Sequence, residues 1–517
     1  MALTPTSQPS LDAPKMPLEG EIPGTPADRL ARDRSLVHGV AWNGVVRLVV
    51  QSAAWASTLI VARLLSPDDY GVMGLATLFL GLIELVTEFG IGIAVATRKG
   101  LTEAQAQELN SVAAMMGVGG MLVICLLAPL AGHFFHDGRL PAVLMALSLT
   151  FLLNSFRSVP WGLLQRELQF KRLAIYDGIQ ALALAALSVV LAALGFRYWT
   201  LVIASIMSAM ITALLAILRH PVAFRRPRVK ALSGLLSFSG SIVGQRAAWY
   251  GYSNADFFIA GKLLGSGPLG NYSLAWNLSH VTDKVTALVL QVTPSVLAKV
   301  QDDNAEMRRY VIRISEALAL TVLPLMVGLA LVAGDFVRLV LGAKWEAMII
   351  PLRILSAYAT VGVIMPLFGQ VLNVTGGERF AMMNNFLQLL IMPVMFLIGG
   401  YYWGVNGIAI AWVVGHPFLA LRLARYTLRR IDLPLSQYAR ESLAPSIAGC
   451  LLMAVAVVSL QAVWPGGPSV SRFASEIVAG ALIYCGAMLL FYRERLERIR
   501  LFTRQALNGR RAGVSTA

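Results

Sequence analysis

Charged side chains inside apolar segments are the residues whose chemistry is most conspicuous in this sequence. The stretch GQRAAWYGYSNADFFIAGKLLG, residues 244–265, is apolar enough to cross a membrane, yet Arg246, Asn254 and Asp256 lie well away from its ends. A charge near the middle of a bilayer costs roughly 3 kcal/mol on insertion scales. We therefore expect such groups to face a water-filled cavity or to pair with one another. Nine ionisable residues fall inside apolar segments: Arg47, Glu84, Glu88, Arg157, Arg246, Asp256, Asp283, Lys284 and Arg353.

Two of these charges belong to an internal repeat. When the sequence is shifted by 199 residues, VVRLVVQSAAWASTLIVARLLSPDDYGVMGLA (45–76) aligns without a gap over GQRAAWYGYSNADFFIAGKLLGSGPLGNYSLA (244–275). An offset that spans an even number of membrane crossings predicts two lobes with the same orientation and a cavity between them. The matched pairs include Arg47 with Arg246, Arg63 with Lys262, and Gly71 with Gly270.

The matched arginines suit an anionic ligand. Arg47 and Arg246 each lie about eleven residues from the start of their predicted helix, or ~16 Å at about 1.5 Å per residue, close to the middle of the bilayer. A guanidinium group is planar, always charged, and binds phosphate oxygens in pairs. A cavity lined by both side chains would therefore fit a diphosphate that carries a polar group and a lipid tail.

Other polar side chains share helical faces with these arginines or lie on neighbouring predicted helices. The acidic residues could carry H⁺ or Na⁺ to drive transport. Alternatively, the four acidic and five basic groups pair between the lobes and hold one conformation. We assign the substrate cavity to Arg47, Arg246, Arg157, Lys284, Gln51, Tyr250 and Asn254, and ion coupling or gating to Glu84, Glu88, Asp256 and Asp283.

The elements that position these residues are predicted to be membrane helices. The 517-residue chain is 57% hydrophobic and 14% charged, whereas soluble domains are about 25% charged. Its apolar runs are long and continuous, which indicates helices and not the alternating strands of a barrel. We predict about fourteen spans: 36–63, 70–96, 110–131, 141–164, 173–195, 198–218, 235–262, 269–298, 313–333, 347–374, 380–402, 404–428, 438–464 and 473–492.

The distribution of basic residues predicts the topology. Of the 43 Lys and Arg residues, 31 lie on the side of the membrane that holds both termini and seven lie on the other side. Basic residues accumulate on the cytoplasmic side, so we expect cytoplasmic N- and C-termini. The net charge of +15 is explained by these membrane borders, where it meets anionic lipid, and does not indicate nucleic-acid binding.

The spans and the repeat together predict an all-α polytopic protein with two pseudo-symmetric six-helix lobes and two additional C-terminal helices. We expect these parts: a disordered cytoplasmic tail (1–34), an N-lobe (35–219), a basic cytoplasmic linker (220–234), a C-lobe (235–430), two further helices (431–492) and a basic cytoplasmic tail (493–517).

Nothing in the sequence indicates a catalytic or metal site. The cysteines lie in apolar runs, which favours core positions over a metal cluster. His133 and His136 offer only two ligands, fewer than a metal site needs. The GSGPLG stretch (265–270) follows a predicted membrane helix and not a strand, so a turn is the better interpretation than a nucleotide site. We expect no enzyme activity, no metal and no bound cofactor.

Five stretches spread over about residues 40–430 form a specific set: LLSPDDYGVMGLATLFLGLIELVTEFGI (64–91), LLQRELQFKRLA (163–174), GNYSLAWNL (270–278), LPLMVGLALVAGDFVRLVLGAKWEAMIIPLRIL (323–355) and NVTGGERF (373–380). Together they resemble the polysaccharide transporter family of the multidrug/oligosaccharidyl-lipid/polysaccharide exporter superfamily. The resemblance implies two six-helix lobes around a central cavity. It also implies flipping of undecaprenyl-diphosphate-linked oligosaccharides across the bacterial inner membrane for exopolysaccharide, capsule or O-antigen synthesis.

The same resemblance implies roles for particular residues and partners. Arg47 best matches a cavity arginine on the first helix of the related lipid II flippases. Membrane lipids, a polysaccharide polymerase and a chain-length regulator are the expected partners, and we expect a monomer. Two alternatives are a cation-coupled multidrug exporter of the same superfamily and a membrane enzyme of polysaccharide assembly. Short outward loops without an acid/base pair weigh against the enzyme.

Overall fold

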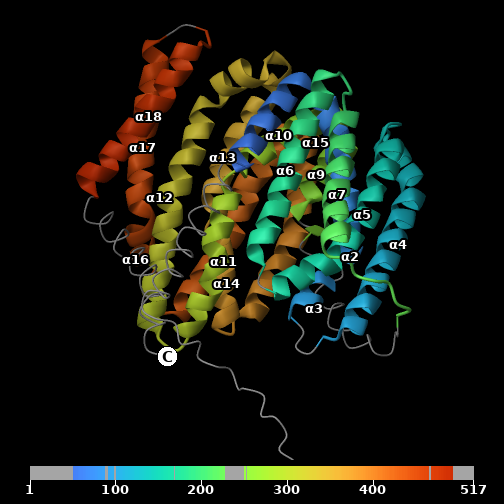
Figure 1. The fold of residues 1–517 in the computed structure, drawn as a ribbon. Coiled ribbons are helices and arrows are strands. Elements are labelled where there is room, and N and C mark those ends of the chain that lie inside the picture. Colours follow the sequence, from blue (N-terminus) through green and yellow to red (C-terminus); the bar gives the residue numbers. More distant parts are fainter. Residues whose placement is uncertain are drawn as a thin grey trace, which may run out of the picture. The chain divides into compact units, whose positions relative to one another are not determined.

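The chain folds into membrane-length helices connected by short loops (Figure 1). It divides after Ser52 into two units, and we describe the second, Ala53–Ala517. The described residues contain helices and no strands, which confirms the all-α prediction for this part of the chain. The computed structural model describes residues 50–87, 91–97, 101–167, 169–227, 250–251, 253–464 and 467–492.

The N-lobe begins with a helix over residues 50–64, of which the second unit holds residues 53–64. Packing of α4 on α5, and of α5 and α6 on α7, builds most of this lobe. The remaining helices of the lobe are α2 (Pro67–Thr87), α3 (Ile91–Thr97), α4 (Glu103–Phe135), α5 (Leu140–Arg166), α6 (Phe170–Ala193) and α7 (Trp199–Arg219).

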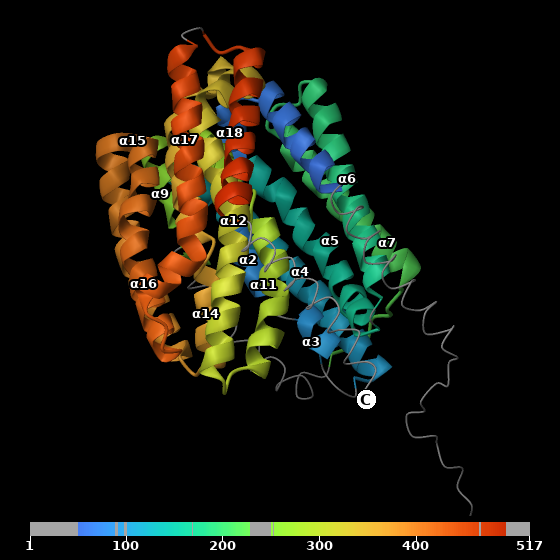
Figure 2. The same ribbon diagram turned by 90° about the vertical axis from the view of Figure 1, so that its left-hand side faces the viewer.

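The C-lobe follows the same plan, and two further helices pack on it. In Figures 1 and 2, α17 and α18 lie beside each other and against α12. The helices are α9 (Ala255–Leu264), α10 (Ser266–Ser279), α11 (Asp283–Lys299), α12 (Asn304–Phe336), α13 (Ile349–Gly362), α14 (Met365–Val374), α15 (Glu378–Arg430), α16 (Leu435–Tyr438), α17 (Ala444–Val463) and α18 (Val470–Phe491), with short turns η1 (Val337–Leu341), η2 (Ala343–Met348) and η3 (Ala439–Leu443).

These helices are suited to a membrane. Among the described residues, nine helical segments are long and apolar enough to cross one. The 53-residue α15 contains Gly404 in the left-handed region (φ 57°), which divides it into two crossings as predicted. Large apolar side chains such as Leu126 and Leu490 are 75% and 79% exposed, as lipid-facing residues would be.

Three spans predicted to be continuous are interrupted. The predicted span 235–262 breaks at Asn254, whose φ of −121° is not helical and whose side chain donates to the Tyr250 carbonyl (3.0 Å). The predicted span 269–298 breaks at residues 280–282, between α10 and α11. The predicted span 70–96 is divided between α2 and α3. Irregular backbone at membrane depth occurs only where protein or a wet cavity surrounds it.

Loop residues set several helix boundaries. Thr102 and Gln105 form a reciprocal capping box at the start of α4, and that helix ends at His136 in the left-handed region (φ 56°). The Asp303 carboxylate accepts from two backbone N–H groups at the start of α12. These polar caps fix the ends of two 33-residue helices, one in each lobe.

In the part of the chain that the structure describes, the apolar core joins the two lobes at one end. One cluster combines Val72, Leu75 and Leu144 of the N-lobe with Leu269 and Trp345 of the C-lobe. At the opposite end the N-lobe has its own small cluster, around Val95 and Leu109, and a separate cluster fills the C-lobe and reaches α17 and α18. We call the joined end, which carries loops 65–66, 136–139 and 194–198, the clamp end.

Candidate functional site at the interlobe face

The residues assigned to the substrate cavity are only partly within the described chain. Gln51 lies in the first unit, at the start of the helix over 50–64, and is not placed relative to the rest. Glu84 and Lys284 lie on α2 and α11, but their side chains are outside the described part of the structure. Arg47, Arg246 and Glu88 lie outside the described residues. Their assignment therefore stays a prediction.

The described interlobe face is dominated by a reciprocal backbone contact at the clamp end. A Cβ atom on Gly71 would collide with the carbonyl of Ser266, and a Cβ on Gly270 would collide with the carbonyl of Pro67. Both partners are related by the same 199-residue offset as the glycines. Residues without side chains let two backbones approach this closely. The sequence repeat is therefore also a two-fold repeat of contacts, and we call residues 63–71 and 262–270 the clamp.

Matched cations extend the same symmetry. Arg63 donates through Nη1 to the carbonyls of Leu339 (2.7 Å) and Val340 (2.9 Å), in the turn η1 that continues α12 to its end at Leu341. Its counterpart Lys262 donates through Nζ to the carbonyl of Phe134 (2.6 Å), at the end of α4, and lies 4.2 Å from that ring. Cations are favourable at helix C-termini, where carbonyls lack partners. Each lobe thus places a cation on a helix end of the other lobe.

Two further C-lobe side chains grip the end of the first helix. The indole of Trp345 is fully buried and donates from Nε1 to the Ala62 carbonyl (2.8 Å). Lys344 donates from Nζ to the Arg63 carbonyl (2.6 Å), and Tyr70 meets the indole edge-on with ring centroids 5.4 Å apart. These contacts satisfy the last carbonyls of that helix and exclude water from them.

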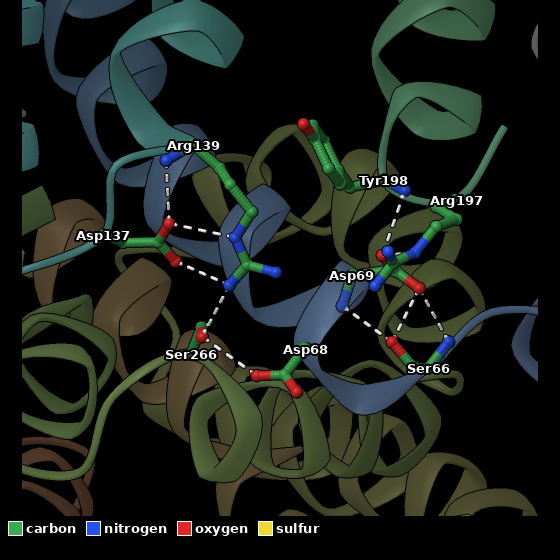
Figure 3. Close-up of polar contacts among 8 residues, drawn as sticks. All are labelled: Ser66, Asp68, Asp69, Asp137, Arg139, Arg197, Tyr198 and Ser266. Carbon is green, nitrogen blue, oxygen red and sulfur yellow. Dashed lines mark hydrogen bonds and ion pairs between the residues drawn. The ribbon is translucent and has the colours of Figure 1, made fainter.

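A side-chain network crosses the clamp beside the glycines (Figure 3). Arg139 of the α4–α5 loop pairs with Asp137 (2.8 Å) and also donates to Ser266 Oγ (3.0 Å). The Ser266 hydroxyl donates in turn to Asp68 Oδ1 (3.0 Å) on α2. Burial alone would raise the pKa of Asp137, but hydrogen bonds from the side chain and backbone of Arg139 hold that pKa below its ordinary value. Asp137 and Arg139 therefore form an ion pair at neutral pH.

A second carboxylate organises the N-lobe side of the clamp. Asp69, 2% exposed, accepts from the backbone N–H and hydroxyl of Ser66 (2.9 and 2.6 Å) and from the N–H of Tyr198 (3.1 Å). Arg197 lies 3.7 Å from the same carboxylate (Figure 3). Asp69 therefore fixes the turn that presents the Pro67 carbonyl to Gly270.

Tyr250, assigned to the substrate cavity, forms a further interlobe contact. Its hydroxyl lies 3.0 and 3.2 Å from the carbonyls of Leu78 and Thr77 on α2. A Cβ on Gly81 would overlap the same ring, so the glycine makes room for it. The tyrosine links the seventh span to the N-lobe one helical turn beyond the apolar part of the clamp, and Asn254 holds the backbone carbonyl of Tyr250 (3.0 Å).

Asp256 neither faces a wet cavity nor pairs with a cation among the described residues, contrary to expectation. It is fully buried in the C-lobe, where Tyr272 Oη (2.6 Å) and Trp412 Nε1 (3.0 Å) donate to Oδ2, and the Phe257 N–H donates to Oδ1 (2.9 Å). Three neutral donors stabilise a carboxylate that lacks a counter-charge. The broken backbone at Asn254 lies beside it, so this is the one assigned coupling residue whose surroundings are fully described.

The remaining assigned residues lie elsewhere. Arg157 on α5 donates to Gln180 on α6 (2.8 Å) and lies 4.9 Å from the Trp161 ring, so it is held by neutral groups within the N-lobe. Asp283 is exposed at the first position of α11, after the break at residues 280–282. The structure does not bring Arg157 to Asp256. No group of three metal-ligating side chains occurs among the described residues.

Several residues of the clamp were missed as functional candidates. Gly71, Gly270, Arg63 and Lys262 had been noted only as matched pairs of the repeat. Their identity at a constant offset was a usable signal, because a two-fold repeat brings equivalent positions to the same interface. Trp345 carried no comparable signal. The clamp can hold the two lobes together at one end. The lobes can separate there only if the contacts of Gly71 and Gly270, and those of Arg63 and Lys262, break together.

Removing both cations should loosen the clamp. The double variant Arg63→Met and Lys262→Met loses three charged hydrogen bonds across the lobes. Because the two side chains are partly exposed, we expect the closed interface to lose only about 1–3 kcal/mol of stability in total. A cysteine introduced by Leu269→Cys replaces a fully buried residue and reports opening of the clamp. In the double variant we expect a membrane-impermeant maleimide to label this cysteine roughly tenfold faster. Arg338→Met is the control, because that guanidinium pairs with Glu346 in the same lobe (3.0 Å). Equal labelling in all variants would contradict the role of the two cations.

Comparisons with known proteins extend this description. Residues 60–350 match the family described as polysaccharide biosynthesis protein. The lipopolysaccharide biosynthesis protein WzxC of Escherichia coli is 21% identical over 386 residues, which are 73% of this chain and 78% of that protein. The succinoglycan biosynthesis transport protein ExoT of Rhizobium meliloti is 23% identical over 324 residues, 60% of this chain and 64% of that protein.

The fold also matches a solved structure. The lipid II flippase MurJ, in a conformation described as inward closed, superimposes with a TM-score of 0.69 at 13% identity. The match covers 88% of this chain and all of that one. At this identity the comparison shows a shared fold of two lobes and further C-terminal helices.

Proposed function

Because the chain belongs to the polysaccharide biosynthesis protein family, we propose that it is a flippase for undecaprenyl-diphosphate-linked oligosaccharides of exopolysaccharide, capsule or O-antigen synthesis. The reciprocal clamp is the observation that carries this proposal. A transporter of two similar lobes needs an interface that closes one end of the path and can reopen. The clamp is built from backbone carbonyls and matched side chains of both lobes, as such an interface would be.

The positive-inside rule supports an orientation for this closure. The clamp end holds the loops with few basic residues, so it faces the periplasm of the bacterial inner membrane, and both termini are cytoplasmic. In this orientation the described conformation is closed toward the periplasm. The domain boundaries given above, with lobes over 35–219 and 235–430, are part of the same proposal.

In the proposed cycle, the substrate enters from the cytoplasmic leaflet and its diphosphate binds Arg47 and Arg246. Paired guanidinium groups match the oxygens of two phosphates and remain charged at every physiological pH. The clamp then opens while the lobes close toward the cytoplasm, and the sugar is released on the periplasmic side. Arg157, Lys284, Gln51, Tyr250 and Asn254 are further candidates for contacts with the substrate.

Coupling to an ion is a separate part of the proposal. Asp256, Asp283, Glu84 and Glu88 would take up H⁺ or Na⁺, and Asp256 is favoured because its carboxylate is buried with neutral donors. No other cofactor is proposed, and the protein is expected to act as a monomer beside a polymerase and a chain-length regulator. It moves its substrate without changing a covalent bond, so it is not an enzyme.

The substrate site is tested by neutralising both arginines. We expect the double variant Arg47→Gln and Arg246→Gln to reduce surface polysaccharide at least a hundredfold, with a normal amount of protein in the membrane and lipid-linked oligosaccharide retained in the cytoplasmic leaflet. The matched control, Arg47→Lys with Arg246→Lys, keeps both charges but loses bidentate binding, so partial export is expected. Normal export from a correctly inserted double Gln variant would refute the assignment.

A further inference from the structure

A polar cavity lies away from the interlobe face, at the end opposite the clamp. It has a volume of about 670 Å³ and lies between the first third of α12 and the segment α16–η3. A second hollow of about 460 Å³ adjoins it along α12 and shares four lining residues with it. The larger cavity is lined by Ile312, Arg313, Glu316, Ser436, Gln437, Arg440 and Glu441. A volume in this range is ordinary for a small-ligand site.

The cavity presents guanidinium groups that the protein does not use. Among the described residues, Arg313 and Arg440 form no hydrogen bond or ion pair. By contrast, Arg309 in the adjoining hollow pairs with Glu306 (3.1 Å), and Arg308 donates to the Asp432 carbonyl (3.2 Å). Guanidinium groups from both walls, with the hydroxyl of Ser436 also in the lining, are suited to a phosphate group.

The same cavity also contains carboxylates. Glu316 lines it and is 4% exposed, and Glu441 accepts a hydrogen bond from Gln437 (3.0 Å). A second negative group would be repelled by these carboxylates, whereas a positive group would be attracted. The lining of the larger cavity therefore matches a ligand that carries one negative and one positive charge.

The wall formed by α16 and η3 is held rigidly. Tyr438 donates to Ser315 Oγ on α12 (2.8 Å), and Ser442 donates to the Tyr438 carbonyl (2.6 Å), with both partners buried. Residues 439–443, directly after Tyr438, form the π-helical turn η3, and Arg440 and Glu441 of this turn line the cavity. Such turns are rare and are frequent at functional sites. The charges are thus presented on a fixed frame.

The apolar surface next to the cavity indicates the kind of ligand. The helix α17 begins directly after the π turn, and one of its faces is apolar and exposed. Spacings of three and four residues place its members on one stripe that leads away from the cavity along the membrane-spanning helix. The exposed stripe consists of Ile447, Leu451, Val455 and Val458. Acyl chains beside this stripe would place a lipid headgroup at the cavity.

We propose that the cavity binds the headgroup of a phospholipid that carries both a phosphodiester and a primary ammonium. Arg313 and Arg440 hold the phosphate, Glu316 accepts from the ammonium, and the acyl chains lie along α17. The site is distinct from the interlobe path and belongs to a resident membrane lipid, not to the transported substrate.

The proposal is tested by lipid binding to the full-length purified protein, measured by native mass spectrometry in detergent. We expect phosphatidylethanolamine to bind at least about tenfold more tightly than phosphatidylcholine, whose ammonium has no N–H to donate, and than phosphatidylglycerol, which has no ammonium. Arg313→Gln with Arg440→Gln should weaken phosphatidylethanolamine binding about tenfold or more. Arg379→Gln, at the same end but outside both hollows, should leave it unchanged.

A second variant separates the ammonium contact from the phosphate contact. Glu316→Gln should bring the affinities for phosphatidylethanolamine and phosphatidylcholine to within about twofold of each other, while a thermal unfolding scan shows that the variant is folded. Soluble phosphoethanolamine should compete only weakly, because it lacks the acyl chains. Equal affinity of the unmodified protein for all three lipids, or full retention of binding by the double arginine variant, would overturn the proposal. Because no transport is measured, the result does not depend on the proposed flippase activity.

Discussion

Replacing Gly71 and Gly270 by alanine is expected to hold the two lobes apart at the clamp end and to abolish polysaccharide export. Each new methyl group would collide with a backbone carbonyl of the other lobe, at Ser266 or Pro67, and backbone cannot yield as a side-chain tip can. Overpacking of this kind costs about 1–3 kcal/mol per site. Two sites would raise the free energy of the closed form relative to the open form by about 2–6 kcal/mol. The ratio of closed to open protein would then fall roughly 30-fold or more.

The separation can be measured directly. Spin labels on Phe196→Cys and Tyr402→Cys would report the distance between the lobes at the clamp end. Phe196 is exposed in the α6–α7 loop of the N-lobe, and Tyr402 is exposed beside the kink at Gly404 in α15 of the C-lobe. The three native cysteines, Cys125, Cys450 and Cys485, would first be replaced. We expect a longer and broader distance distribution in the double alanine variant, together with loss of surface polysaccharide.

Matched glycine controls are available in the same chain. A Cβ on Gly119 of α4 or on Gly369 of α14 would meet open space, and neither glycine has a positive φ. Alanine at these positions should leave both the distance and the export unchanged, or stabilise the helix slightly. If the variants at the clamp behave like these controls, the reciprocal contact is not part of the transport cycle.

The second large effect is expected at Asp256. Replacing it by alanine removes the acceptor of the buried Tyr272 hydroxyl and one of the two acceptors of the Trp412 indole N–H, which also lies 3.0 Å from Tyr272 Oη. A buried donor left without a partner costs about 1–3 kcal/mol. We therefore expect the free energy of unfolding to fall by roughly 1–3 kcal/mol, visible as a lower thermal midpoint of the purified protein. Asp302→Ala, at an exposed position, should not change the midpoint.

A conservative variant distinguishes a structural role of Asp256 from ion coupling. Asp256→Asn keeps an oxygen that can accept from Tyr272 and Trp412 but cannot bind or release a proton. If the carboxylate couples transport to an ion, Asp256→Asn should recover most of the stability lost in Asp256→Ala while export stays low. Full export from a stable Asp256→Asn protein would leave Asp256 with a structural role only.

The sequence predicted the helical fold and the two-lobe repeat because both depend on local patterns. Long apolar runs indicate membrane-spanning helices. The constant offset between Gly71 and Gly270 indicates that they occupy equivalent positions in the two lobes. The breaks at Asn254 and at residues 280–282 were not predicted, because hydropathy averages side chains over a window and is insensitive to backbone geometry. A buried amide or carboxylate that stabilises such a break looks the same in sequence as one that faces water.

The candidate site was predicted less well, for a related reason. Asp256 is charged and lies in a membrane segment, so the sequence placed it in a wet cavity. Its donors, Tyr272 and Trp412, are 16 and 156 positions away and only the folded chain brings them together. Tyr250 was assigned to substrate, but its hydroxyl contacts carbonyls of α2. Polar groups of one helix were recognisable in the sequence, whereas their partners on other helices were not.

The shared apolar core at the clamp end has a consequence for biogenesis. Val72, Leu75 and Leu144 are inserted into the membrane before Leu269 and Trp345 have been synthesised. The apolar residues that the N-lobe contributes to this core are therefore exposed in the bilayer during synthesis. The surface around Gly71 remains uncovered until the C-lobe has been inserted. Lipid or an insertion chaperone must cover that surface in the interval. The two lobes are thus halves of one folding unit, although each resembles a domain.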